Sequence, residues 1–199
     1  MSELVVNTNL TLDGVMQSPA APDEDRRGEF ERGGWAAPYF DQVMGDVAAE
    51  GMAKDGAMLF GRRTYEQFVS FWPTQPDDNP FAAVLNNRQK YVASRTLEEP
   101  LPWSNSTLLR GDAMEAVAEL KEQPDNDLVV LGSGELVQSL MRANLVDEYV
   151  LLIHPLVLGT GRRLFSDGGS SADLRLVDTK TTTTGVVIAT YQPVEPTTG

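Results

Sequence analysis

Short apolar segments alternate with segments of helical periodicity along the chain, and this alternation limits the possible folds more than any other feature. The strand-like segments are residues 4–12, 57–60, 90–93, 106–109, 128–131, 148–153, 174–180 and 185–192. The helix-like segments are residues 38–54, 64–71, 81–87, 113–122 and 135–143. An alternation of this kind predicts an α/β fold in which helices cover a largely parallel sheet.

The chain has 199 residues and shows neither an internal repeat nor a second composition regime. This length favours a single domain, which we assign to residues 1–193. We expect the last residues, 194–199, to form a disordered tail. Residues 15–37 contain prolines, glycine pairs and mixed charges, and they predict a long loop of the kind that carries function.

The charge balance excludes several classes of partner. Acidic residues outnumber basic ones by 29 to 16, and the resulting net charge of −13 repels nucleic acids and anionic membranes. The chain has no cysteine and one histidine, which excludes thiolate and multi-histidine sites, so we predict no metal. The absence of cysteine suits the cytoplasm, and we find no signal-peptide pattern and no apolar run long enough for a membrane helix.

Three predicted strands end in small, hydroxylated or cationic residues, in the segments LFGRRT, YVASRT and VVLGSGEL. The carboxyl ends of parallel strands form the ligand crevice of α/β sheets, and the helix N-termini there favour anions. Arg62, Arg63 and Arg95 would supply the positive charge that such a site needs, so the pattern predicts a phosphate-rich nucleotide. Solvated arginines and a simple tight turn at GSG are the alternatives, although paired arginines at a helix start oppose the helix dipole unless an anion is present.

Candidates for catalysis are few. Asp41 lies beside the apolar stripe of the predicted helix 38–54 and is the candidate proton donor, with a solvated charge as the alternative. Trp35 follows two glycines and either covers a substrate or anchors the loop. We expect His154 to pack at a strand end rather than to titrate in a mechanism.

Taken together, several segments resemble the dihydrofolate-reductase-like proteins. The segments are LTLDGVMQ, GGW, AMLFGRRTYEQF, NPFAAVLNNRQKYVASRTL, LVVLGSGELVQSLMRANLVDEYVLLIHPLVLGTGRRLF and GVVIATYQP. Within that family the chain is similar to the branch of the reductase domain of bifunctional riboflavin-biosynthesis deaminase/reductase proteins, over roughly residues 3–193. The resemblance implies a three-layer α/β sandwich with a mixed, mostly parallel central sheet and an antiparallel C-terminal strand.

The resemblance also implies that NADPH binds across the strand ends. Arg62, Arg63 and Thr64 would hold the nucleotide phosphates, and Ser94, Arg95 and Thr96 would face the 2′-phosphate. The pyrophosphate would lie along Gly132, Ser133, Gly134, Glu135 and Leu136. Asp13 and Trp35 are the candidate substrate contacts, and the family suggests a homodimer.

We therefore predict an NADPH-dependent reductase that transfers a hydride to a small pteridine-, pyrimidine- or carbonyl-like substrate. The substrate stays open, because Leu131 takes the place of a glutamate that contacts substrate in the riboflavin reductases. The zinc deaminase half of those bifunctional proteins is also absent. The alternatives are a nucleotide-binding or sensor protein with little activity, and a subunit that uses its apolar segment 145–159 mainly for assembly.

Overall fold

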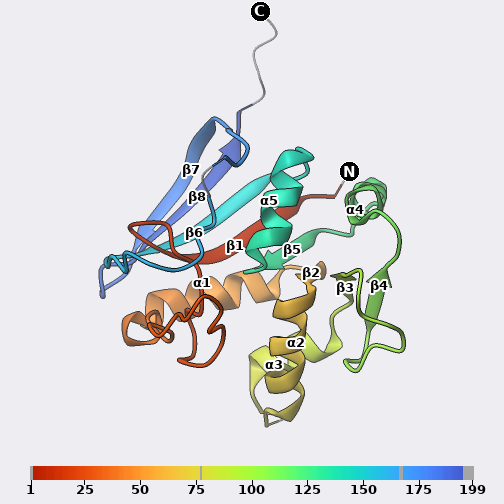
Figure 1. The fold of residues 1–199 in the computed structure, drawn as a ribbon, viewed down its shortest axis with the longest axis horizontal. Helices are drawn as coiled ribbons and strands as arrows, with labels where there is room; N and C mark the ends of the chain where they lie inside the picture. Colours follow the sequence, from red (N-terminus) through yellow and green to blue (C-terminus); the bar gives the residue numbers. More distant parts are fainter. Residues whose placement is uncertain (1, 77, 166–167, 195–199) are drawn as a thin grey trace, which may run out of the picture.

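The structure of the chain is a computed structural model that describes residues 2–76, 78–165 and 168–194. In these residues one sheet contains the strands β1 (Leu4–Thr11), β2 (Ala57–Gly61), β3 (Lys90–Ala93), β4 (Ser106–Leu109), β5 (Leu128–Leu131), β6 (Glu148–His154), β7 (Leu174–Thr181) and β8 (Val187–Pro193). Their order across the sheet is β4-β3-β2-β5-β1-β6-β8-β7. Strand β8 is antiparallel to both of its neighbours, and the other neighbouring pairs are parallel (Figure 1).

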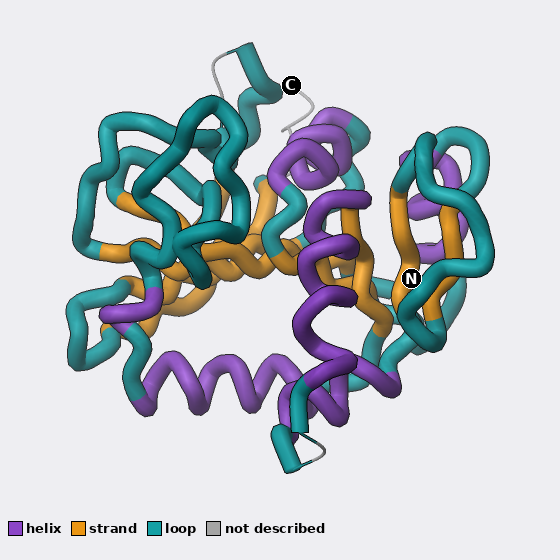
Figure 2. The backbone as a smooth tube through the Cα atoms, turned by 60° about the horizontal axis from the view of Figure 1, so that its bottom comes forward, coloured by secondary structure: helices purple, strands orange, loops and turns teal. Residues whose placement is uncertain are grey.

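Helices lie on both sides of the sheet, as Figure 2 shows. The helices are α1 (Gln42–Ala53), α2 (Arg62–Phe71), α3 (Pro80–Asn87), α4 (Ala113–Glu122) and α5 (Gly134–Arg142). Two short 3₁₀ helices, η1 (Ala37–Tyr39) and η2 (Trp72–Thr74), complete the described helical segments. The predicted fold, a three-layer α/β sandwich with a mostly parallel sheet and an antiparallel C-terminal strand, is confirmed.

The strand β2 shows how a continuous apolar run becomes the middle of this sheet. Its side chains point alternately to the two faces because successive residues of a strand face opposite ways. Leu59 packs into the core beneath α4 and α5, whereas Met58 and Phe60 pack into the cluster that holds Tyr65 of α2 and Leu85 of α3. The strand is therefore fixed from both sides, and so is the position of its carboxyl end.

Three helices begin earlier than the sequence pattern predicts, and one of them is α3, which begins at Pro80 rather than at residue 81. Helix α2 begins at Arg62, two residues before the predicted start, and α5 begins at Gly134 rather than at residue 135. The reason at α2 is that Gly61 serves both as the last residue of β2 and as the extended N-cap of the helix, with φ −77° and ψ 157°. Both arginines consequently lie in the first helical turn.

The described helices include none that is long and apolar enough to cross a membrane. Of the predicted C-terminal tail, residues 195–199 lie outside the described part of the chain, and only residue 194 is described.

Candidate functional site

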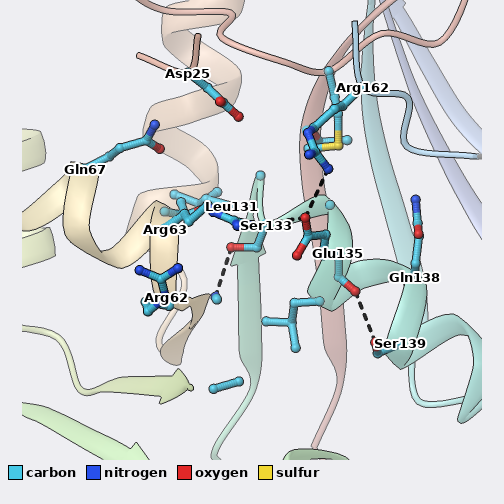
Figure 3. Close-up of a pocket in the computed structure, with 18 of the residues that line it drawn as sticks. Asp25, Arg62, Arg63, Gln67, Leu131, Ser133, Glu135, Gln138, Ser139 and Arg162 are labelled. Carbon is cyan, nitrogen blue, oxygen red and sulfur yellow. Dashed lines mark hydrogen bonds and ion pairs between the residues drawn. The ribbon is translucent and has the colours of Figure 1, made fainter. Parts of the chain in front are cut away.

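A cleft of about 1040 Å³ opens at the carboxyl ends of β2, β3 and β5 (Figure 3). Parallel neighbours bring their carboxyl ends to the same edge of a sheet, which is why three segments distant in sequence meet here. All residues predicted to bind a nucleotide line this cleft, namely Arg62, Arg63, Thr64, Ser94, Arg95, Thr96, Gly132, Ser133, Gly134, Glu135 and Leu136. The roles of these residues are argued below as part of the proposed function.

The junction of β2 and α2 presents an uncapped helix N-terminus to the cleft. Glycine 61 has no side chain to accept a hydrogen bond, so no side-chain cap satisfies the first N–H groups of α2. Arg62 turns along the helix to Glu66, with Nη1 3.2 Å from a carboxylate oxygen. The combination of free N–H groups and guanidinium groups can accommodate an anion.

The junction of β5 and α5 carries an unusual backbone. Gly132 and Ser133 are both left-handed, with φ values of 63° and 52°, and this conformation is costly for a residue with a Cβ. The hydroxyl oxygen of Ser133 accepts a hydrogen bond from the N–H of Gly61 at 3.1 Å. The Ser133 side chain thus connects the β5–α5 junction to the β2–α2 junction. It does not cap α5, whose N-terminus has no side-chain cap.

The end of β3 forms a tight turn around Ser94. The hydroxyl oxygen of Ser94 accepts hydrogen bonds from the backbone N–H groups of Thr96 and Leu97, at 3.2 and 3.1 Å. This turn directs the segment into the cleft, and the side chain of Arg95 is exposed there. The hydroxyl hydrogen of Ser94 and the guanidinium of Arg95 can therefore both donate to a ligand.

Gly134 lies where two segments of the protein come into close contact. A Cβ at this position would collide with the thioether sulfur of Met16. Met16 comes from the loop that follows β1 and also lines the cleft. The glycine thus lets this loop lie directly against the start of α5.

The most highly charged part of the cleft surrounds Glu135. Its Oε1 atom accepts from the guanidinium groups of Arg27, Arg63 and Arg162, at 3.2, 3.0 and 3.1 Å. Figure 3 shows Arg63 and Arg162 approaching this carboxylate from different elements. Arg27 and Arg162 were not among the residues selected from the sequence, although both belong to Arg-Arg pairs like Arg62-Arg63.

A third residue that was not selected from the sequence is Glu24. It lines the cleft, and its carboxylate accepts from the N–H groups of Ala20 and Ala21, at 2.8 and 3.3 Å. Burial raises the pKa of Glu24 above its ordinary value, because its effect is larger than that of these hydrogen bonds, which lower the pKa. The length of the 15–37 loop was the one signal in the sequence for functional groups in this segment.

Asp41, the predicted proton donor, lies at the start of α1 outside the cleft lining, and its role in catalysis stays a prediction. Asp41 is the N-cap of α1, where its carboxylate accepts from the N–H of Met44 at 3.0 Å. The other carboxylate oxygen accepts from the hydroxyl and N–H of Thr183, at 2.6 and 2.7 Å. These hydrogen bonds, led by that of the Thr183 hydroxyl, lower the pKa of Asp41. Asp41 does not line the cleft.

Trp35 does not line the cleft either, and its side chain anchors the loop; its predicted contact with a substrate stays a prediction. Its side chain is buried, and the indole N–H donates to the carbonyl of Gln17 at 2.8 Å. It packs in a cluster with Phe30, and its ring meets that of His154 edge-on, with centroids 5.2 Å apart. A buried tryptophan whose N–H has a partner stabilises the loop that carries it.

Asp13, the other predicted substrate contact, also has a structural position. Its carboxylate accepts from the Thr11 hydroxyl at 2.6 Å and from the N–H groups of Leu158 and Gly159, at 3.1 and 2.8 Å. The hydrogen bond from Thr11 is the largest influence that lowers the pKa of Asp13 to about 2. Asp13 thus ties the end of β1 to the segment after β6, outside the cleft lining. Among the described residues, no group of three or more His, Asp or Glu side chains is placed to hold a metal.

Comparison with known proteins assigns the chain to a family. The profile of the RibD C-terminal domain matches residues 2–188. The chain belongs to the RibD C-terminal domain family. Domains of this family are reductases, and membership therefore indicates an oxidoreductase.

Two relatives come from Bacillus subtilis (strain 168). The uncharacterized protein YyaP is 28% identical over 191 residues, which cover 94% of this chain and 93% of YyaP. The uncharacterized protein YwjB is 26% identical over 123 residues, which cover 62% of this chain and 66% of YwjB.

Solved structures support the same fold for this member of the RibD C-terminal domain family. A putative riboflavin biosynthesis protein from Shewanella sp. PV-4 superposes with a TM-score of 0.72 at 23% identity, covering 97% of this chain and 99% of that one. A pyrimidine reductase-like protein from Corynebacterium diphtheriae gives 0.68 at 12% identity, with 98% and 93% covered. Acinetobacter baumannii RibD gives 0.66 at 14% identity, and the match covers 98% of this chain but 58% of that protein.

Proposed function

We propose that the protein is an NADPH-dependent reductase that transfers a hydride to a small pteridine-, pyrimidine- or carbonyl-like compound. The observation that carries the proposal is the convergence, in one cleft, of every residue selected from sequence for nucleotide binding. Two uncapped helix N-termini and several guanidinium groups meet there in a chain of net charge −13. An anionic dinucleotide is the ligand that this arrangement suits.

Each part of the cleft would have its own task in binding. Arg62, Arg63 and Thr64 would hold phosphates at the start of α2, and the backbone from Gly132 to Leu136 would lie along the pyrophosphate. Ser94, Arg95 and Thr96 would face the 2′-phosphate at the end of β3. When bound, NADPH supplies the hydride, while the protein orients both reactants and excludes water.

The descriptions of similar structures support one class of substrate for this proposal. Two of the similar structures are described as a riboflavin biosynthesis protein and a pyrimidine reductase-like protein, which supports a heterocyclic substrate for this chain. Asp41 caps α1 outside the cleft lining, which favours another source for the proton. We therefore propose that the accompanying proton comes from water or from a cleft carboxyl group.

The test is a calorimetric titration with NADPH and, in parallel, with NADH. Arg95→Ala should weaken NADPH binding by ~10-fold or more, since a charge-assisted hydrogen bond to a phosphate contributes ~1.5–3 kcal/mol. It should weaken NADH binding by less than ~3-fold, because NADH lacks the 2′-phosphate. Arg110→Ala is the matched control: it removes an equal charge from an exposed side chain that pairs with Glu99 and does not line the cleft.

Equal losses for the two cofactors would remove Ser94, Arg95 and Thr96 from the 2′-phosphate role. If neither nucleotide bound to the unaltered protein, the proposed function would fail.

A second candidate is a nucleotide-binding or sensor protein that uses the same cleft without efficient chemistry. Leu131, which lines the cleft at the end of β5, favours it, because leucine offers no carboxylate to a substrate. NADPH oxidation with any member of a pteridine, pyrimidine and quinone panel would reject this candidate. We also propose a homodimer of cytoplasmic location, and sedimentation at several protein concentrations tests the dimer.

A further inference from the structure

Three arginines from separate parts of the chain share a single carboxylate oxygen. Arg27 comes from the loop after β1, Arg63 from the first turn of α2, and Arg162 from the segment after β6. Their distances to the Oε1 atom of Glu135 lie between 3.0 and 3.2 Å. Among the described residues, Oε1 is the Glu135 carboxylate oxygen that takes part in hydrogen bonds, and Oε2 has no partner.

The charges of this cluster are not balanced. Arg27 has a second partner in Asp25, so two carboxylates face three guanidinium groups. A guanidinium group stays protonated and has five N–H donors, so one carboxylate oxygen satisfies a small part of what the three groups can donate. The cluster therefore keeps a positive charge and spare donors, in a chain whose net charge is −13.

Glu135 stays accessible to water in this cluster. Its side chain is 65% exposed, and water competes for each of its ion pairs, so a ligand of higher charge can compete as well. The residue sits in the first turn of α5, whose N-terminus has no side-chain cap. A ligand that enters the cleft meets the same guanidinium groups together with the free N–H groups of this turn.

We propose that Arg27, Arg63 and Arg162 form a binding site for a diphosphate group, and that the Glu135 carboxylate occupies this site until the ligand displaces it. A diphosphate offers more acceptor oxygens and more negative charge than a carboxylate, so it can satisfy several guanidinium groups at once. For its natural ligand the inference rests on the proposed nucleotide function. The displaced Glu135 side chain turns into solvent, and its backbone stays at the ligand.

The first experiment measures inorganic pyrophosphate binding by calorimetry at low ionic strength, where surface charges are least screened. Glu135→Gln removes the competing charge and should tighten pyrophosphate binding by ~10-fold, the size of effect expected from one close charge in partly screened surroundings. The matched control is Glu50→Gln, which removes an equal charge from a pair with Lys180 outside the cleft. It should change binding by less than ~2-fold.

The second experiment removes a guanidinium group. Arg162→Gln should weaken pyrophosphate binding by ~10-fold, because one set of charge-assisted hydrogen bonds is lost. Arg26→Gln is its control, since Arg26 carries the same charge but pairs with exposed Asp23 and does not line the cleft. Far-ultraviolet circular dichroism and thermal melting establish that each variant is folded.

Unchanged or weaker pyrophosphate binding in Glu135→Gln would overturn the inference, because Glu135 would then organise the arginines instead of competing for them. Loss of binding in the Arg26 variant equal to that in the Arg162 variant would overturn it too, since net charge alone would explain both. Pyrophosphate contains neither adenosine nor nicotinamide. A protein that binds pyrophosphate as predicted but not NADPH would contradict the proposed function and leave this site in place.

Discussion

The residues selected from the sequence line the cleft at the strand-end edge of the sheet, but not in the loop region between β1 and α1. At the edge, every residue selected from the sequence lines the cleft, from Arg62 to Leu136. In the loop region and at the start of α1, none of the three selected residues does, since Asp13, Trp35 and Asp41 all have structural partners. The loop instead contributes Arg27 and Glu24, which the sequence did not single out.

The difference has a physical origin. A parallel sheet brings the carboxyl ends of its strands to one edge, so the position of a residue just after a strand follows from topology alone. The orientation of a side chain in a loop depends on the hydrogen bonds that it forms in the folded protein. Asp13 accepts a hydrogen bond from Gly159, and Arg27 donates one to Glu135, and each partner is more than a hundred residues away in the chain. Local sequence contains no sign of such partners.

Trp35 offers the largest effect with which to test this comparison. Trp35→Ala removes a buried indole and its hydrogen bond to Gln17, so the free energy of unfolding should fall by ~3–5 kcal/mol. Urea denaturation measures the loss. The control is Phe40→Ala, whose side chain is 64% exposed and which should cost less than ~1 kcal/mol. A stable Trp35→Ala protein with impaired turnover would instead restore the lid interpretation.

His154 tests the same buried region by its response to pH. Its side chain is fully buried at the end of β6, where its Nε2 lies 3.0 Å from the Asn9 side-chain oxygen. Burial lowers the pKa of His154 from 6.5 to about 4, so the unfolded chain binds a proton that the folded protein excludes between these values. Stability should therefore fall as the pH drops from about 6.5 to about 4, by about 3 kcal/mol from this residue.

The measurement compares urea denaturation of the protein and of His154→Gln across this pH range. Glutamine does not titrate, so the variant should gain stability relative to the unaltered protein as the pH falls, and other titrating groups cancel in the difference. A difference that stays constant between pH 4 and 6.5 would mean that His154 accepts its proton in the folded state, and that the region around Trp35 is open to water.

Much of the fold could be predicted from the sequence because its signals are local. The apolar run at 128–131 and the N-cap Asp112 gave the bounds of β5 and α4 as the structure has them. The early start of α2 was missed because Gly61 is at once a strand residue and a helix cap, a double use that periodicity does not reveal. The Glu135 cluster was missed for another reason: its members come from separate segments, and only the tertiary fold joins them.

Substitution of Asp41 should have the smallest effect on stability. It distinguishes the two interpretations of Asp41, as a helix cap and as a proton donor. Asp41→Ala removes the N-cap of α1 and both contacts with Thr183, and it should lower the melting temperature by roughly 2–4 °C. Asp41→Asn keeps an oxygen that can accept from the N–H of Met44, so it should lose less. An asparagine cannot donate the proton of a carboxylic acid, however. If Asp41→Asn kept its melting temperature but lost turnover, Asp41 would be the proton donor after all; if turnover survives, the helix cap accounts for this residue.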